Sequence, residues 1–239
     1  NAVLGPDGVY TTELKPASTA VVLTVAPTTA MVMIDGHPVV NVGGTNVQAR
    51  ADMAVGYYGT PRERLVSQAK CENCHEQLSL HGSNRSGDPQ GCVVCHNASS
   101  GWSDDADIAG PIAMGAFVHN IHLGAVPGVG AITYPQGIAN CQACHLEGTY
   151  DTARAGAIAI STGPGADQTI YTDDTWDSAT SGTCGTCHSS GDAKAHMAQN
   201  GGSFAIAGGK TLGASTAQES CSVCHGEGRI ADTAAAHEE

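Results

Sequence analysis

The ten cysteines of this sequence fall into five copies of one short pattern, Cys-x-x-Cys-His, with no cysteine left over. Two thiols three positions apart lie on one face of a helical turn, so both can add to the two vinyl groups on one edge of a haem. The histidine that follows then lies under the iron and can donate its imidazole as the proximal ligand. The pattern is therefore typical of covalent c-type haem attachment. The five copies are Cys71, Cys74 and His75; Cys92, Cys95 and His96; Cys141, Cys144 and His145; Cys184, Cys187 and His188; and Cys221, Cys224 and His225.

Three other uses of paired cysteines fit the sequence less well. A structural zinc site combines Cys-x-x-Cys units in pairs, and five is an odd number of units. A disulfide framework does not need a histidine after every second cysteine. A thioredoxin-like motif occurs once in a βαβ context, not five times in a glycine-rich acidic chain. We therefore expect five covalently attached haem c groups.

Six further histidines lie outside the five motifs, and five six-coordinate irons would need five distal ligands. His119 and His122 are three positions apart on one face of a predicted helix, so they could serve two adjacent haems. His81 follows His75 too closely to reach the opposite face of the same haem easily, so we expect it to bind a neighbouring haem. The predicted distal ligands are His81, His119, His122, His196 and His237.

His37 is the histidine left over, and it lies between Asp35-Gly36 and Pro38. These residues mark a turn in which the imidazole is incidental, so we expect His37 to be a spare or an inter-subunit ligand. Methionine is the competing distal ligand, and it would raise the reduction potentials. The supply of histidine makes it unnecessary. The methionines are Met31, Met33 and Met53 in the N-terminal region, and Met114 and Met197 near the motifs.

The distribution of residue types predicts two domains. Residues 1–65 contain no cysteine, and strand-like runs at 20–25, 30–34, 39–42 and 47–58 are separated by turn residues. We expect a small antiparallel β domain there. Residues 66–239 hold all five motifs, long connections rich in Gly, Ser and Asp, and only short predicted helices. We expect a mostly irregular, short-helix multihaem c domain, organised by packed haems that replace a core poor in aromatic residues.

Charge and composition exclude several partners. The chain carries 10 Lys and Arg against 23 Asp and Glu, a formal charge of −13, which disfavours nucleic acid and anionic membranes. The longest uncharged stretches, 16–34 and 108–146, are broken by Pro and Gly and predict no membrane span. The first residues lack the pattern of a signal peptide, so we expect it to be absent or already removed. Asp104, Asp105 and Asp107 could hold Ca²⁺, although such clusters are usually solvated loops.

Several longer strings are more specific than the haem motif alone. These are the first two motifs with Leu78, Leu80, His81, Gly82 and Arg85 between them, Phe-Val-His-Asn-Ile-His-Leu-Gly at 117–124, and the segment 219–237. Over about 64–237 the chain resembles the OmcA/MtrC family, the extracellular outer-membrane multihaem cytochromes of metal-reducing bacteria.

The resemblance implies a fold, a ligand set and a location. In that family a β-rich domain precedes a pentahaem domain, the pair is repeated, and every iron has two histidine ligands. The resemblance assigns the same five histidines as distal axial ligands. It also implies electron transfer outside the cell to minerals, electrodes, flavins or partner cytochromes. This chain resembles half of a family member, its β region is short for the family's split barrel, and no cysteine is free to carry an N-terminal lipid.

The leading hypothesis is therefore an electron carrier, in one of two forms, and the alternative is an enzyme. It could be a subunit that stacks head to tail with copies of itself into a filament, with His37 or His237 ligating a haem of the next copy. It could be a secreted monomeric shuttle or a docked subunit of an outer-membrane conduit. A multihaem reductase would need an open iron position and often Cys-x-x-Cys-Lys, which does not occur in this sequence.

Overall fold

The computed structural model describes residues 3–4, 6, 10–11, 29–99, 110–126, 128–129, 132–150, 157–167, 170–208 and 219–237. The predicted strand at 20–25 and the three aspartates at 104–107 lie outside these residues. The described part combines small antiparallel sheets with short helices, which confirms the expected fold class.

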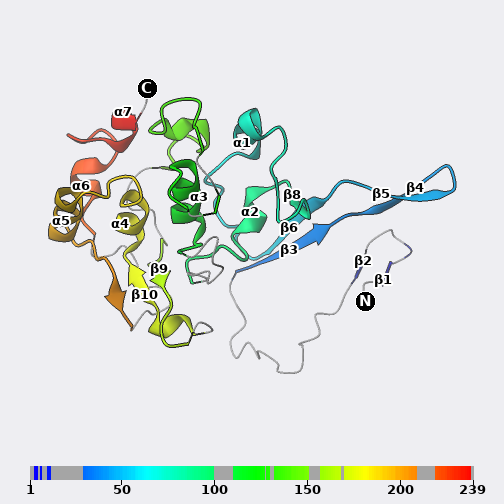
Figure 1. Cartoon of the computed structure of the whole chain (residues 1–239), viewed down its shortest axis with the longest axis horizontal. Coiled ribbons are helices and arrows are strands. Elements are labelled where there is room, and N and C mark those ends of the chain that lie inside the picture. The colour runs from blue at the N-terminus through cyan, green and yellow to red at the C-terminus, as the bar shows by residue number, and fades with distance from the viewer. Residues whose placement is uncertain are drawn as a thin grey trace.

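A two-stranded ribbon forms the most regular part of the N-terminal region. Strand β3 (Ala30–Gly36) pairs antiparallel with β6 (Asp52–Tyr58) over seven residue pairs, and β4 (Val39–Val42) pairs with β5 (Thr45–Gln48). The turn between β4 and β5 uses Gly43 and Gly44 at φ +60° and +87°, values that glycine adopts without strain. The tip of the ribbon extends away from the rest of the molecule (Figure 1).

The remaining strands are short. Strand β1 (Val3–Leu4) pairs with β2 (Tyr10–Thr11), and β7 (Ser79–Leu80) pairs with β8 (Arg85–Ser86). Farther along the chain, β9 (Ile160–Gly163), β10 (Thr175–Asp177) and β11 (Ile206–Ala207) form a three-stranded sheet in the order β11-β10-β9. The sequence predicted β3 and β4 closely, but it merged β5 and β6 into one run, because the residues between them at 49–51 are Ala, Arg and Ala and include no turn residue.

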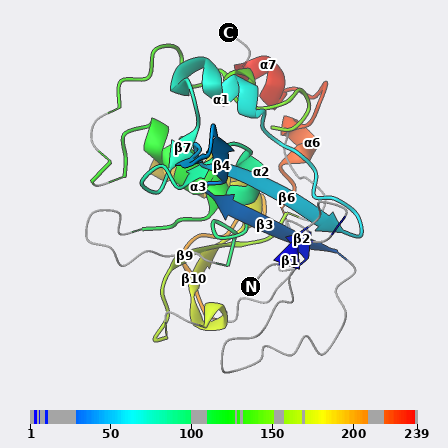
Figure 2. The ribbon, with the colours of Figure 1, turned by 90° about the vertical axis from the view of Figure 1, so that its right-hand side faces the viewer.

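The helices begin or contain the haem motifs, and they carry four of the five predicted distal histidines. In chain order they are α1 (Gln68–His75), α2 (Pro89–Cys92), α3 (Met114–His122), η1 (Cys141–Ala143), η2 (Tyr171–Asp173), α4 (Ala179–Cys184), α5 (Gly191–Gln199), α6 (Ser222–His225) and α7 (Thr233–His237). Helix α3 lies centrally, with α4 to α7 on the side away from the ribbon (Figures 1 and 2). Among the described residues, no helix has the length and apolar character needed to cross a bilayer.

The polypeptide builds only a small apolar core of its own. In the described segments seven hydrophobic residues are buried, and five of them are alanines. The buried apolar residues are Ala51, Met53, Ala113, Ala116, Ala159, Ile160 and Ala179. Because alanine contributes little apolar area, packing of side chains alone gives this chain weak support.

The ribbon packs against the haem-motif region through Met53. Its side chain is 6% exposed and lies so close to Gly91 of α2 that a methyl group at Gly91 would overlap it. Met53 also bridges to Gly87, and Arg85 forms a 2.6 Å ion pair with Asp35 of β3. The ribbon and the second motif are thus joined by packing, backbone pairing and charge.

We expect Met53→Ala to lower the free energy of unfolding of the mature protein by about 2–5 kcal/mol, the range for truncating a buried methionine. Denaturant unfolding followed by far-UV circular dichroism measures the change. Val40→Ala on β4, where the side chain is exposed, is the control and should stay within about 0.5 kcal/mol of the parent. Equal effects of the two substitutions would show that the ribbon does not pack on α2.

Candidate haem-attachment sites

Each Cys-x-x-Cys-His motif adopts a single helical turn. In the last four motifs the amide of the second cysteine donates to the carbonyl of the first at 3.2 Å, and the histidine amide donates to the same carbonyl at 2.8–2.9 Å. The first motif lies within α1, so it has the same helical form. The two thiols and the histidine of each motif are therefore arranged by local backbone hydrogen bonds, as thioether attachment requires.

The structure brings every motif histidine next to one histidine from elsewhere in the chain. The ring centres are 6.0–6.1 Å apart in all five pairs. Two imidazoles that bind one metal ion from opposite sides, each at about 2 Å from nitrogen to metal, have ring centres roughly 6 Å apart. The spacing therefore fits an iron between the rings. The pairs are His75 with His122, His96 with His81, His145 with His119, His188 with His237, and His225 with His196.

Four histidines from these pairs are oriented by a backbone hydrogen bond at Nδ1. The Nδ1–H group donates to a carbonyl at 2.7–2.9 Å, which leaves Nε2 as the nitrogen with a free lone pair. Metal-binding histidines are held in this way in many proteins. The donors and acceptors are His96 to Ile112, His122 to Val118, His225 to Ala231 and His237 to Thr233.

The five partner histidines come from four different elements. Helix α3 carries His119 and His122, and its one-turn spacing directs them to two different motifs. His196 lies on α5 and His237 on α7. His81 follows β7 in the turn to β8, where its backbone has φ +54°. This left-handed conformation is uncommon for a residue with a side chain, and here it occurs where the ring lies beside His96.

Two of these rings have a pKa below the usual value for histidine. Desolvation, and then the nearby His122, lower the pKa of His119. Desolvation also lowers the pKa of His81, with a further contribution from Arg85 and His96. A neutral imidazole is the form that binds metal, so both environments favour ligation over protonation.

A cavity lies at the second motif and is lined largely by apolar side chains. The ring of Phe117 stacks on His96 with ring centres 5.3 Å apart and an interplanar angle of 9°. Two methionines from the ribbon also reach the cavity, although the sequence placed them away from the motifs. The lining includes Met33, Met53, Leu78, His81, Cys92, His96 and Phe117. The correction has a simple reason: β3 and β6 are adjacent to β8 in the fold but distant from the motif in sequence.

Thiols of different motifs lie close together. A hydrogen bond between the thiols of Cys71 and Cys144 raises the pKa of Cys71 and lowers that of Cys144. Burial raises the pKa of Cys184 to about 11, and Cys221 and Cys141 add to this electrostatically. The first motif is thus next to the third, the third to the fourth, and the fourth to the fifth.

Polar contacts fix the first motif against the third. The Nζ group of Lys70 donates to the carbonyls of Gln142 and His145 at 2.8 and 2.6 Å. The amide of Ser67 donates to the carbonyl of Cys144 at 3.0 Å. These bonds join residues more than 70 positions apart, so they set a spacing that the local turns cannot.

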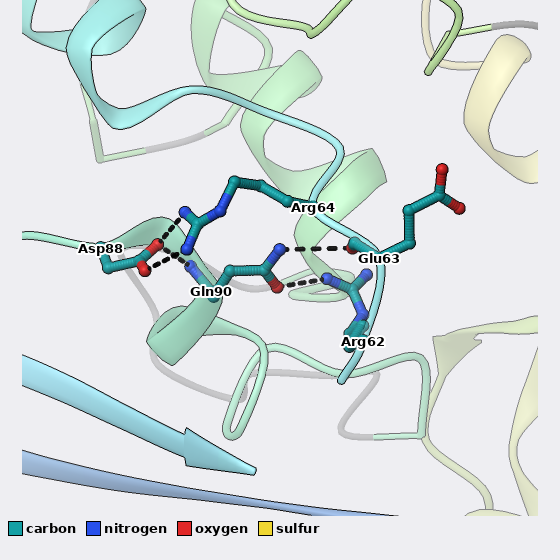
Figure 3. Close-up of polar contacts among 5 residues, drawn as sticks. All are labelled: Arg62, Glu63, Arg64, Asp88 and Gln90. Carbon is teal, nitrogen blue, oxygen red and sulfur yellow. Dashed lines mark hydrogen bonds and ion pairs between the residues drawn. The ribbon is translucent and has the colours of Figure 1, made fainter. Parts of the chain in front are cut away.

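The second motif is held by a polar cluster at the start of α2 (Figure 3). Asp88 caps the helix by accepting from the Gln90 amide at 3.0 Å, and both its oxygens accept from Arg64 at 2.7 Å. Gln90 is 3% exposed and is bonded to Arg62 and to the Glu63 carbonyl. The segment before the first motif is therefore attached to the helix that leads into the second.

His37 does not join any of the histidine pairs. Its Nδ1 group donates to the carbonyl of Ala49 at 3.0 Å, across the base of the β4–β5 hairpin. The turn that the sequence predicted around His37 is wrong: residues 37–38 link β3 to β4 along one side of the ribbon, and the chain reverses at Gly43 and Gly44 instead.

Three features of the sites were missed in the sequence. The ribbon methionines gave no signal, because strand alternation predicts which face they share but not what covers it. Glu219 binds the start of α4. The segment 219–237 indicates a haem motif from sequence alone, but no role for this glutamate. Asp-Pro before an attachment motif is a helix-start signal, and it could have identified Asp88 as a cap.

Comparisons with known proteins agree with this geometry. Residues 63–238 match the family model described as "Outer membrane cytochrome MtrC/MtrF-like, domains II/IV". The crystal structure of the outer membrane decaheme cytochrome OmcA is similar at a TM-score of 0.50 and 24% identity, over 76% of this chain and 26% of that one. The crystal structure of MtrC from Shewanella baltica OS185 has a TM-score of 0.47 and 18% identity, over 83% of this chain and 34% of that one. The chain thus spans about a third or less of these two proteins, and no curated protein matches it.

We expect Asp88→Asn to destabilise the mature protein by about 1 kcal/mol near neutral pH, because Asn can still cap the helix but loses the negative charge at its start and the bidentate ion pair with Arg64. Bonding to Arg64 lowers the pKa of Asp88 in the folded state, so its stabilisation is present above about pH 4 and is lost as the pH falls through the folded pKa. Unfolding free energies of parent and variant, measured from pH 7 down to pH 3, should therefore converge in acid. A difference that stays constant would contradict this role.

Proposed function

The chain belongs to the outer membrane cytochrome MtrC/MtrF-like family, and from that premise we propose that it transfers electrons outside the cell through five haem c groups with two histidine ligands each. Membership confirms the expected kinship with OmcA/MtrC cytochromes, which are electron-transfer proteins rather than enzymes. The number of haems, their ligands and the partners are the proposal.

The observation that carries it is the set of five histidine pairs at one common spacing. Structural histidines have no reason to repeat a ring separation within 0.1 Å at five places, each time with the histidine of an attachment motif. A shared iron gives that reason. When bound, each haem supplies one-electron redox chemistry.

The residues divide into three roles under this proposal. The ten motif cysteines hold the porphyrins as thioethers: Cys71, Cys74, Cys92, Cys95, Cys141, Cys144, Cys184, Cys187, Cys221 and Cys224. The proximal ligands are His75, His96, His145, His188 and His225, and the distal ligands are His122, His81, His119, His237 and His196 in the same order. With both axial positions filled by protein, no iron is open to a substrate, which favours a carrier over a reductase.

The contacts between motifs support a continuous row of sites. The electrostatic neighbours among the thiols support an order of first, third, fourth and fifth for the attachment sites. The second site is joined to the first and third by α3, because Met114 at its start donates to the His96 carbonyl and its end carries His119 and His122. An electron carrier needs adjacent sites, since transfer weakens steeply with distance.

The partners we propose are other cytochromes and an extracellular acceptor such as a mineral, an electrode or a flavin, with the protein at the bacterial cell surface or secreted. Association of copies head to tail would lengthen the row of sites. Every motif histidine has its partner ring in the same chain. Such association would therefore rest on surface contact rather than on a ligand from the next copy.

Carbon monoxide tests the ligand assignment, because it binds ferrous haem only where an axial position is open. We expect mature protein to contain five haems by mass and to bind no carbon monoxide when reduced. His122→Ala should bind one equivalent, seen as a change in the Soret band. His37→Ala is the matched control and should bind none.

A variant that keeps the position filled guards against a misfolded result. His122→Met should bind no carbon monoxide and should raise the reduction potential of one haem, because methionine ligation favours the ferrous state. Carbon monoxide binding by the unmodified protein, or none by His122→Ala with five haems attached, would contradict the assignment.

Sedimentation velocity detected in the Soret band tests the role of His37. We expect the parent protein and His37→Ala to give the same boundaries, whatever their size, because every motif histidine already has a partner ring from its own chain and none is left for His37. A fast, broad boundary that collapses to a small species in His37→Ala would identify it as an inter-subunit ligand instead.

A further inference from the structure

A buried carboxylate lies between the last two attachment motifs, and the proposed function leaves it unused. Glu219 is 7% exposed and stands two residues before Cys221. Its carboxylate binds the start of α4, which leads into the motif at Cys184. One side chain therefore links two attachment sites.

Four hydrogen bonds converge on this carboxylate. The Oε1 atom accepts from the Ser178 hydroxyl at 2.8 Å and from the amide and hydroxyl of Ser181 at 2.8 and 2.7 Å. The Oε2 atom accepts from the Thr180 amide at 2.9 Å. Both serines are themselves buried, at 7% and 1% exposed. Each carboxylate oxygen accepts from one backbone amide, a group that can only donate, and this arrangement suits an anion.

The charge of Glu219 has no cationic partner in the part of the chain that the structure describes. No ion pair to Lys, Arg or His is found for it there. Burial works against ionisation, but the bonds from Ser181, Thr180 and Ser178 outweigh it and keep the pKa of Glu219 below its usual value. The site is thus a fixed negative charge that only neutral dipoles stabilise.

This charge acts on both motifs. Burial raises the pKa of the Cys184 thiol most, followed by the charge of Cys221 and then that of Glu219. Burial also raises the pKa of the Cys221 thiol most, and the charge of Glu219 is the next cause. The same thiols would carry the fourth and fifth porphyrins. A group that acts on both thiols electrostatically also acts on redox centres attached to them, because interactions in a poorly hydrated interior are screened weakly.

We propose that Glu219 is a positioning and potential-setting residue, which fixes the fourth attachment site against the fifth and lowers the reduction potentials of the haems held there. The proposal rests on the proposed function for the presence of those haems. A fixed anion stabilises the ferric form, which carries one more positive charge than the ferrous form. These two centres would then have lower potentials than they would have without the charge.

The test is Glu219→Gln in the mature protein, which removes the charge and keeps the size of the side chain. We expect five haems by mass and a positive shift of two of the five midpoint potentials in spectroelectrochemical titration. Glu227→Gln is the matched control, because Glu227 is exposed and follows the same motif by two residues. It should leave the titration curve unchanged. A Glu219→Gln curve that superimposes on the parent curve would overturn the proposal.

Ser181→Ala separates charge from packing and covers the case in which Glu219→Gln does not mature. It removes one donor and keeps the anion, so we expect a lower free energy of unfolding with little change in the potentials. A shift as large as that of Glu219→Gln would show that the charge is not the cause. Fewer than five haems in the unmodified protein would instead refute the proposed function, so the two failures are distinguishable.

Discussion

The structure depends on one constraint: the histidine of each motif must face a second histidine from a distant part of the chain. A Cys-x-x-Cys-His turn supplies three of the groups that a haem needs, but the second axial position lies on the opposite side of the ring and cannot be reached by the same turn. Each motif must therefore be met by another segment. The ring separation of 6.0–6.1 Å at five places shows that the chain satisfies this condition throughout.

This condition explains the thin polypeptide core. Helices of four to nine residues are long enough to carry a motif or one or two histidines, and longer helices would separate the segments that must meet. The buried apolar residues are mostly alanine, so elements approach closely without large side chains between them. Backbone and lysine hydrogen bonds, such as those of Lys70, then hold the motifs in place where a normal domain would use apolar packing.

Two carboxylates near the motifs are stabilised in different ways. Asp88 is neutralised by Arg64 at the surface, whereas Glu219 is buried and stabilised by neutral donors alone. The first arrangement supports a helix end, and the second places a net negative charge between two motifs. The ribbon adds apolar methionines at the second motif. The five sites therefore differ in their electrostatic surroundings although their local turns are nearly the same.

The sequence determined the attachment chemistry, because the motif is local: its thiols and histidine are placed by hydrogen bonds between residues three and four positions apart. It also predicted the five partner histidines, by their number and by the one-turn spacing of His119 and His122. Which motif each partner meets was decided only by the tertiary structure. His237 lies beside His188 rather than the nearer His225, and His122 beside His75, because segments far apart in sequence are joined by contacts that no local pattern encodes.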